Sequence, residues 1–132
     1  MKYMLALIGD ESGWDDVTDE EMRAMMEPWD EFEQQLADAG VKLAGEGLQP
    51  SATATTVKVG EGEDRVVTDG PFAETKEQLG GFYLLECDDL DAALEWAKRV
   101  PLEPGGSVEV RPVMDYAQYG FEEPEARVEG SS

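Results

Sequence analysis

The spacing of apolar residues along the chain changes from strand-like to helix-like and back. Residues 2–8 form a short apolar run bounded by a turn signal, which predicts a first strand. Thr18 and Glu21 then form a capping box at the start of a helix. Pro28 predicts a kink or a restart in this helix, and Gly40 suits its left-handed end. Apolar residues recur there at spacings of three and four, on one face: Met22, Met25, Met26, Trp29, Phe32 and Leu36.

The middle and the end of the chain have strand-like patterns. Residues 41–44 predict a second strand, which is expected to break at the glycines of residues 45–48. Residues 52–59 and 65–68 are β-branched and alternating, and a glycine-rich loop joins them, so they predict a β-hairpin. Residues 107–114 alternate at their start and predict the last strand.

One more strand and a second helix are expected between the hairpin and the last strand. Residues 81–87 are apolar and predict a strand whose odd and even side chains face opposite sides, so Tyr83 lies opposite to Phe82. Asp88 or Asp89 caps the helix that follows. Its buried stripe is expected at Leu90, Ala93, Leu94, Ala97 and Val100.

This order of elements predicts an α+β fold. Strand, helix, strand, hairpin, strand, helix, strand is the split βαβ pattern of a ferredoxin-like βαββαβ domain with an inserted β-hairpin. Two helices cover one face of such a sheet, and an apolar opposite face needs a cover as well. The simplest cover is a second copy, so we expect a two-fold homodimer with facing sheets. We expect the domain at residues 1–114 and an acidic, partly disordered arm and tail at residues 115–132. Candidates for packing in the arm are Tyr116, Tyr119 and Phe121, with a mobile tail after Pro124.

The charge of the chain limits the partners that it suits. Asp and Glu number 31 against 10 Lys and Arg, which gives a formal net charge of −21. Nucleic-acid affinity depends on neutralised phosphates, and anionic lipids repel acidic surfaces in the same way, so we expect neither partner. The acidic residues are spread along the chain, which also suggests adaptation to high salt.

Two further features bear on location and redox chemistry. No apolar run approaches the roughly 20 residues that span a bilayer, and residues 1–8 lack the cleavage site of a signal peptide, so we expect a cytoplasmic protein. Cys87 is the only cysteine, which excludes an intrachain disulfide. Asp88 and Asp89 beside it disfavour a thiolate, so a structural role is expected.

The stretch at residues 69–83 identifies a family. It contains Asp-Gly-Pro-Phe, three charged residues and a Gly-Gly pair that leads into the apolar strand. Together with residues 45–48, 52–57, 91–97 and 106–112, it resembles the YCII-related family, in the subgroup that carries a DGPF motif. The resemblance covers roughly residues 1–114 and implies a ferredoxin-like fold that dimerises into an α/β barrel-like assembly. It implies no assigned reaction, and for some relatives it implies a link to alternative sigma factors.

The broader family suggests one acid–base pair that this chain lacks. The proposed pair joins a His on the first helix to an Asp, and Asp38 resembles the position of that Asp. The chain contains no His. The pair therefore cannot form here.

Two carboxylates near the DGPF motif are candidate catalytic residues. Asp69 can accept backbone N–H bonds in an Asx-turn, or it can act as a general base at the mouth of a cleft. Glu74 and Glu77 share a face if residues 74–77 form a helical turn. They then provide a carboxylate pair for acid–base chemistry, and otherwise a solvated acidic loop.

Three other residues are candidate ligand-binding residues. Glu46 lies between two glycines, where it faces a pocket or marks a bend in the strand. Tyr83 donates a hydrogen bond from its strand or packs at the dimer face, and we favour the dimer face. Arg111 binds an anionic ligand or pairs with a buried carboxylate, and we favour the ion pair.

The sequence supports two functions. The first is a small-molecule binding domain with a cleft lined by Glu46, Asp69, Glu74 and Tyr83, with proton transfer as the chemistry if it is catalytic. The second is a non-catalytic interaction or regulatory protein linked to a sigma-factor circuit. The absence of His removes the common nucleophilic dyads and makes zinc unsuitable, and no phosphate-binding loop follows Gly80 and Gly81. We therefore expect no metal and no cofactor.

Overall fold

The computed structural model describes residues 1–12 and 16–121, so the tail predicted after Pro124 lies outside the described residues. The elements are β1 (Lys2–Asp10), α1 (Asp19–Ala39), β2 (Lys42–Gly47), η2 (Ser51–Thr53), β3 (Thr55–Val59), β4 (Arg65–Asp69), β5 (Glu77–Glu86), α2 (Leu90–Arg99), β6 (Ser107–Pro112) and η3 (Tyr116–Tyr119). The predicted α+β class is confirmed.

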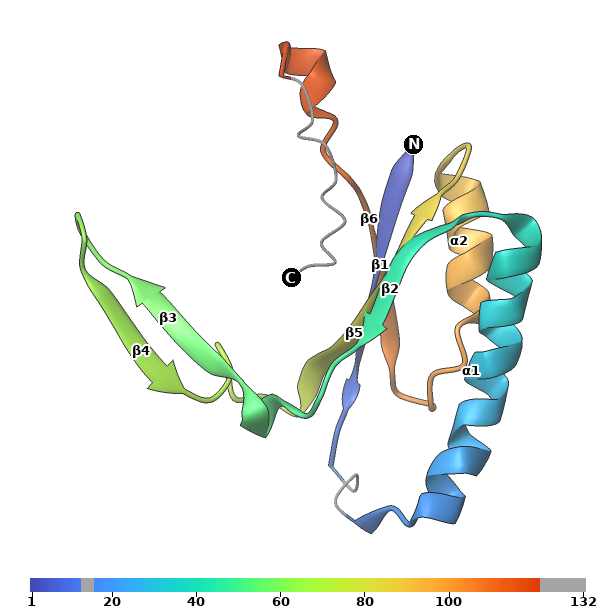
Figure 1. Ribbon diagram of the computed structural model, residues 1–132, viewed down its shortest axis with the longest axis horizontal. Helices are drawn as coiled ribbons and strands as arrows, with labels where there is room; N and C mark the ends of the chain where they lie inside the picture. Colours follow the sequence, from blue (N-terminus) through green and yellow to red (C-terminus); the bar gives the residue numbers. More distant parts are fainter. Residues whose placement is uncertain (13–15, 122–132) are drawn as a thin grey trace, which may run out of the picture.

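Four strands form the main sheet, and both helices lie on one of its faces (Figure 1). The strand order is β2-β5-β1-β6, and every neighbouring pair is antiparallel. The core lies between this face and the helices and consists of Tyr3, Leu5, Leu7, Phe32, Leu36, Tyr83, Leu85, Cys87 and Ala93. Tyr83 and Leu85 of β5 are thus in the core, as the alternation along residues 81–87 predicts, whereas Leu79 is exposed.

The predicted break at residues 45–48 is wrong, because β2 continues to Gly47. A Cβ atom at Gly45 would lie 2.7 Å from Cδ1 of Tyr83, and one at Gly81 would lie 2.7 Å from the carbonyl oxygen of Glu46. The glycines therefore allow β2 and β5 to pair closely rather than interrupt the strand. β5 also begins earlier than expected, at Glu77, so residues 74–77 do not form a helical turn.

The first helix has the predicted ends but not the predicted break. The hydroxyl of Thr18 accepts a hydrogen bond from the backbone N–H of Glu21 at 3.1 Å, and Gly40 has a φ of 67°. The helix runs unbroken through Pro28. Only Phe32 and Leu36 of its apolar stripe are buried, and Met26 is 44% exposed. The packed part of α1 is therefore its C-terminal half.

The second helix is rotated relative to the predicted stripe. Asp89 caps it, accepting a hydrogen bond from the N–H of Ala92 at 2.9 Å. Leu90 and Leu94 are exposed, contrary to expectation. Ala93 is buried and Ala97 and Val100 are partly buried, as predicted, and Ala92 and Trp96 join them against the core. Trp96 packs against Phe32 of α1 with ring centroids 6.3 Å apart, which explains the rotation.

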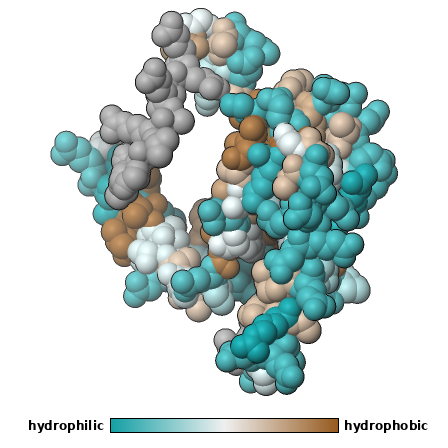
Figure 2. Space-filling model, turned by 45° about the vertical axis from the view of Figure 1, so that its right-hand side comes forward, coloured by the Kyte–Doolittle hydropathy of each residue, from teal (hydrophilic) through white to brown (hydrophobic). Residues whose placement is uncertain are grey.

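β3 and β4 form a separate two-stranded sheet that projects away from the main sheet (Figure 1). The register pairs Val57 with Val67 and Val59 with Arg65, so the three valines share one face of this hairpin. They are 53%, 66% and 68% exposed for Val57, Val67 and Val59. Figure 2 shows hydrophobic residues gathered on the hairpin and hydrophilic residues over much of the helix side. The hairpin thus has an apolar face that its own chain leaves exposed.

Candidate functional site

The second face of the main sheet carries a small apolar group between charged edges. Alternation along β1 and β5 directs four side chains away from the helices, and we call them the open sheet face: Met4, Ala6, Phe82 and Leu84. Glu46 on β2 lies opposite Phe82, while Glu109 and Arg111 on β6 lie opposite Ala6 and Met4. Neither α1 nor α2 lies on this side in Figure 1.

Glu46 and Arg111 lie on the same face but at opposite edges of the sheet. Three strand spacings separate β2 from β6, which is roughly 14 Å. Arg111 pairs instead with Glu109, with 2.7 Å from Nη2 to Oε1. An ion pair was the favoured hypothesis, but the carboxylate of Glu109 is exposed and not buried as expected. Within one subunit the two candidate residues therefore do not form one binding site.

Tyr83 lies on the helix-covered face, away from the open sheet face. Its hydroxyl donates a hydrogen bond to Oε2 of Glu33 at 2.8 Å, so the donor alternative holds. The favoured dimer-face position is wrong, because Tyr83 is buried in the core under the helices. Lys42 donates to Oε1 of the same carboxylate at 2.6 Å. Sequence reasoning missed Glu33 and Lys42, because residues 33 and 42 meet only when α1 packs beside β2.

This cluster shifts two pKa values. Burial raises the pKa of the Tyr83 hydroxyl well above its usual range, and the hydrogen bond to Glu33 and its charge raise it further. For Glu33, burial acts to raise the pKa, but the hydrogen bonds from Lys42 and Tyr83 outweigh burial and leave it lowered. Tyr83 therefore stays protonated and Glu33 stays charged at neutral pH.

The turn of the DGPF motif depends on backbone rather than on the Asp69 side chain. Gly70 has a φ of 109°, which favours glycine. Its N–H donates to the carbonyl of Ala54 at 2.7 Å, and its carbonyl accepts from the hydroxyl of Thr56 at 2.8 Å. The Asp69 carboxylate makes no hydrogen bond within the described part of the chain, so it is not consumed by an Asx-turn there.

Residues 71–76 form a loop that Gln78 organises. The side-chain amide of Gln78 donates to the carbonyls of Ala73 at 2.8 Å and Thr75 at 3.1 Å. Phe72 is 89% exposed at the surface of this loop. Glu74 is exposed as well, so it does not meet Glu46 or Tyr83 in a shared cleft.

A hollow of about 320 Å³ lies where the hairpin joins the main sheet. We call it the junction hollow; its apolar lining includes Leu48, Pro50, Phe72 and Leu79, and its polar lining includes Thr56 and Gln78. Beside it, both carboxylate oxygens of Glu11 accept from the N–H of Ser51 at 3.0 Å, and the Ser51 hydroxyl donates to the same group. These bonds tie the loop after β1 to the turn before the hairpin.

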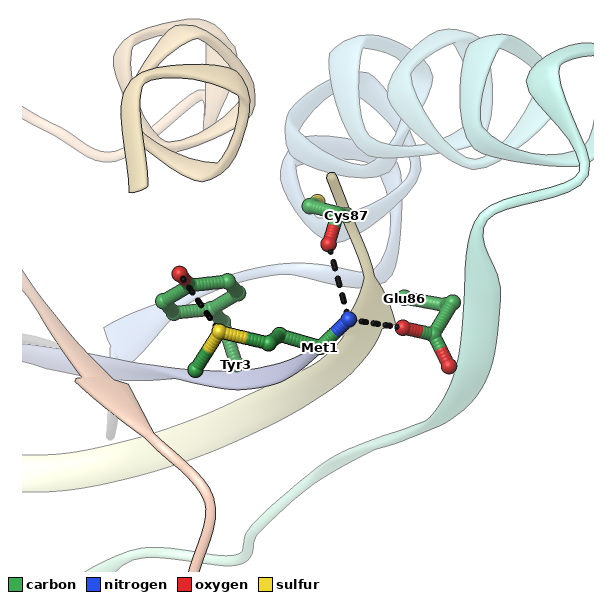
Figure 3. A network of polar contacts seen from close by, with 4 residues as sticks. All are labelled: Met1, Tyr3, Glu86 and Cys87. Atoms are coloured by element: carbon green, nitrogen blue, oxygen red, sulfur yellow. Dashed lines mark hydrogen bonds and ion pairs between the residues drawn. The ribbon is translucent and has the colours of Figure 1, made fainter. Parts of the chain in front are cut away.

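The surroundings of Cys87, the only cysteine, indicate a structural role (Figure 3). The α-amino group of Met1 donates to the carbonyl of Cys87 at 3.1 Å and to Oε2 of Glu86 at 2.6 Å. Burial, followed by the charge of Glu86, raises the pKa of the Cys87 thiol. The thiol is therefore protonated at neutral pH and unsuited to nucleophilic chemistry.

A model of the YCII-related domain family matches residues 1–117. The chain belongs to the YCII-related domain family. It is also 39% identical over 118 residues to "Uncharacterized protein R00369" of Rhizobium meliloti (strain 1021), a match that covers 88% of this chain and 94% of the relative. Neither name states a reaction, so a function must be argued from the geometry.

Asp38, which resembles the family's proposed Asp, accepts a hydrogen bond from Nε2 of Gln34 at 2.9 Å near the end of α1. Within residues 1–12 and 16–121, no group of three or more acidic or sulfur side chains could hold a metal ion. None of the helices in these ranges is long and apolar enough to cross a membrane.

Proposed function

We propose that this YCII-related protein is a homodimer of the DGPF subgroup that binds a small organic molecule in the junction hollow. The observation that carries the proposal is the lining of the hollow, in which Pro71 and Phe72 of the Asp-Gly-Pro-Phe stretch meet Leu48 and Leu79. The motif that identifies the subgroup is thus part of a concave surface. The strand order β2-β5-β1-β6 supports the ferredoxin-like arrangement.

The lining of the hollow favours a neutral or cationic ligand that is mostly apolar. Its volume of about 320 Å³ lies at the small end of ligand pockets. Thr56 and Gln78 supply a hydroxyl and an amide for orientation, and a chain of net charge −21 repels anions. Phe72 is exposed enough to close over a bound molecule.

If the protein catalyses proton transfer, Asp69 and Glu74 are its acid–base residues. These carboxylates flank the Pro71–Ala73 segment of the loop, and neither lines the hollow in this structure. A ligand that extends from the hollow over the loop would lie beside them. Acid–base chemistry by this pair stays a prediction, as do the domain boundary at residue 114 and the cytoplasmic location.

The homodimer is supported by two apolar surfaces that neither α1 nor α2 covers. The open sheet face faces away from both helices, and the valine face of the hairpin is exposed. A two-stranded hairpin is only marginally stable by itself. A second copy covers both surfaces with one symmetric contact.

The alternative function is a non-catalytic interaction protein in a sigma-factor circuit. The exposed valine face of the hairpin favours it, since such a face can bind a different protein instead of a second copy. In that case the junction hollow has no ligand. The two functions therefore differ in what the hollow binds.

Titration of ¹⁵N-labelled protein with p-cresol, a small neutral phenol, tests the ligand-binding proposal. We expect saturable amide shifts confined to residues 48–56 and 70–79, and an affinity at least fivefold lower in Phe72→Ala. Phe121→Ala is the matched control, because Phe121 is also exposed but lies in the C-terminal arm. Unchanged binding by Phe72→Ala, or shifts that never saturate, would contradict the proposal and favour the interaction protein.

A further inference from the structure

Two connections join the hairpin to the main sheet, and both contribute to the lining of the junction hollow. The first connection runs from β2 to β3 and supplies lining residues between Leu48 and Ala54, which we call the first wall. The second runs from β4 to β5 and supplies Pro71 and Phe72, the second wall. β3 and β4 pair with each other in a sheet of their own (Figure 1). The position of the hairpin therefore depends on what holds these two connections.

Hydrogen bonds hold the connections at the hairpin end and at the sheet end. At the hairpin end they are joined to each other, because the N–H of Gly70 donates to the carbonyl of Ala54 at 2.7 Å. At the sheet end the second connection is held by the side-chain amide of Gln78, which donates to the carbonyls of Ala73 and Thr75. The first connection needs an equivalent anchor on the main sheet.

Glu11 provides this anchor. Its two carboxylate oxygens each accept from the N–H of Ser51 at 3.0 Å, and Oε1 also accepts from the Ser51 hydroxyl. The turn that presents Glu11 is fixed in its turn, because Asp10 accepts from the N–H of Ser12 at 2.8 Å. Bonds to an ionised acceptor are stronger than bonds between neutral groups. Glu11 and Ser51 are both partly buried, so losing the carboxylate would leave two donors of Ser51 without this partner.

The anchors of the two walls lie at the same end of the β1–β5 pair. Asp10, the last residue of β1, pairs with Glu77, and Gly9 pairs with Gln78. We propose that Glu11 is a positioning residue of the junction hollow, whose carboxylate fixes the first wall and the hairpin relative to the main sheet. The effect on ligand binding rests on the proposed function, whereas the effect on the hairpin does not.

Single-molecule energy transfer between dyes attached at Glu63→Cys in the hairpin loop and Glu95→Cys on α2 measures the position of the hairpin. The full chain carries Cys87→Ala as well, and a subnanomolar concentration keeps a second copy from holding the hairpin. Glu11→Ala should broaden or shift the transfer-efficiency peak of the otherwise unchanged chain, because Ser51 loses its anchor. Glu11→Gln should restore most of the original peak, since its amide oxygen can accept from Ser51.

Titration of the ¹⁵N-labelled full chain with p-cresol measures the effect on the hollow. Glu11→Ala should lower the affinity at least about threefold, and Glu11→Gln should stay close to the wild type. Ser51→Ala removes only the hydroxyl bond, so it should act in the same direction but less, and it serves if Glu11→Ala does not fold. Glu61→Ala is the matched control for both measurements, because it removes the same charge from an exposed position in the hairpin loop. It should change neither the peak nor the affinity.

The two measurements separate failure of this inference from failure of the proposed function. An unchanged transfer-efficiency peak in Glu11→Ala overturns the positioning role, whether or not p-cresol binds. A changed peak with an unchanged affinity for p-cresol overturns the link between Glu11 and the hollow. A wild type that binds no p-cresol contradicts the proposed function, and the transfer-efficiency peak then still decides whether Glu11 fixes the hairpin.

Discussion

The helix-covered core and the projecting hairpin bury their apolar side chains to very different extents. Leu5, Leu36 and Leu85 are fully buried, whereas Val57 and Val67 on the hairpin are 53% and 66% exposed. Both regions have strand-like sequences, so the difference comes from what packs against them. Two helices complete the core, while nothing within the described subunit covers the valine face.

The core therefore holds the subunit together, whereas the valine face of the hairpin is a surface that the subunit presents to a partner. Substitutions in the core should change the free energy of unfolding at any protein concentration. Substitutions on the hairpin should change assembly and leave the core stable. The junction hollow lies between the two regions, so a ligand there would also fix the hairpin relative to the sheet.

Leu85→Ala should have the largest effect on the core. Leu85 is 0% exposed near the end of β5, and removing three carbons leaves a cavity that the surrounding helices cannot close. We expect a loss of about 2–5 kcal/mol in the free energy of unfolding, measured by urea denaturation. Leu94→Ala on α2, where the leucine is 37% exposed, should cost far less. Equal losses in the two variants would contradict this account of the core.

Gly45→Ala should have the next largest effect. The added Cβ atom would lie 2.7 Å from Cδ1 of Tyr83 and 3.1 Å from Cε of Lys42, so the ring or the strand must move. We expect a loss of about 1–3 kcal/mol by urea denaturation. Gly47→Ala is the control, because nothing lies within 4 Å of a Cβ atom there. A tolerated Gly45→Ala would show that β2 and β5 are not held this closely.

Glu33→Gln should produce a smaller effect that depends on pH. Because the folded-state pKa of Glu33 is lowered, its charge stabilises the fold above the ordinary value of 4.5, and this contribution is lost as the pH falls through the lowered folded-state value. Its side chain is 39% exposed, so we expect less than about 1 kcal/mol.

Urea denaturation at pH 7 and pH 3 measures this contribution. The wild type should lose more stability on acidification than Glu33→Gln. Glu31→Gln, an exposed position on the same helix, should follow the wild type. A Glu33→Gln profile parallel to that of the wild type would show that the cluster with Tyr83 and Lys42 contributes nothing to folding.

Local sequence signals predicted the elements but not what each glycine or proline does in them. The Thr18 cap, the Gly40 helix end and the alternation along residues 81–87 are local, and the structure confirms them. Gly45 looked like a strand break, yet its role depends on Tyr83 of a strand far along the chain. Pro28 predicted a kink or a restart, and the helix continues through it without a restart.

The candidate site was predictable only in part, because its geometry depends on contacts between residues that are far apart in the sequence. The DGPF stretch was found from sequence, and Phe72 does line a hollow. The single cleft expected for Glu46, Asp69, Glu74 and Tyr83 does not form in one subunit, because strand parity places Tyr83 on the face opposite to Glu46 and the hairpin carries Asp69 away. The alternation of side chains along a strand can be predicted from the sequence. The direction in which the hairpin projects from the main sheet cannot.

Val57→Thr combined with Val67→Thr should have the smallest effect on the subunit and a large one on assembly. Threonine keeps the shape and β propensity of valine, and both positions are exposed, so the free energy of unfolding measured under monomeric conditions should change by less than about 0.5 kcal/mol. The dimer dissociation constant, measured by sedimentation, should rise at least tenfold if a second copy covers the valine face, because each dimer then loses four apolar contacts.

Thr56→Ser combined with Thr68→Ser on the opposite face of the hairpin is the control, since Thr56 pairs directly with Thr68. This variant should leave the dimer unchanged. If the valine variant dimerises like the wild type, the hairpin is not part of the subunit contact, and its apolar face would then favour a different protein as partner. The contrast between a self-sufficient core and a hairpin that needs a second copy therefore depends on this comparison of the two hairpin faces.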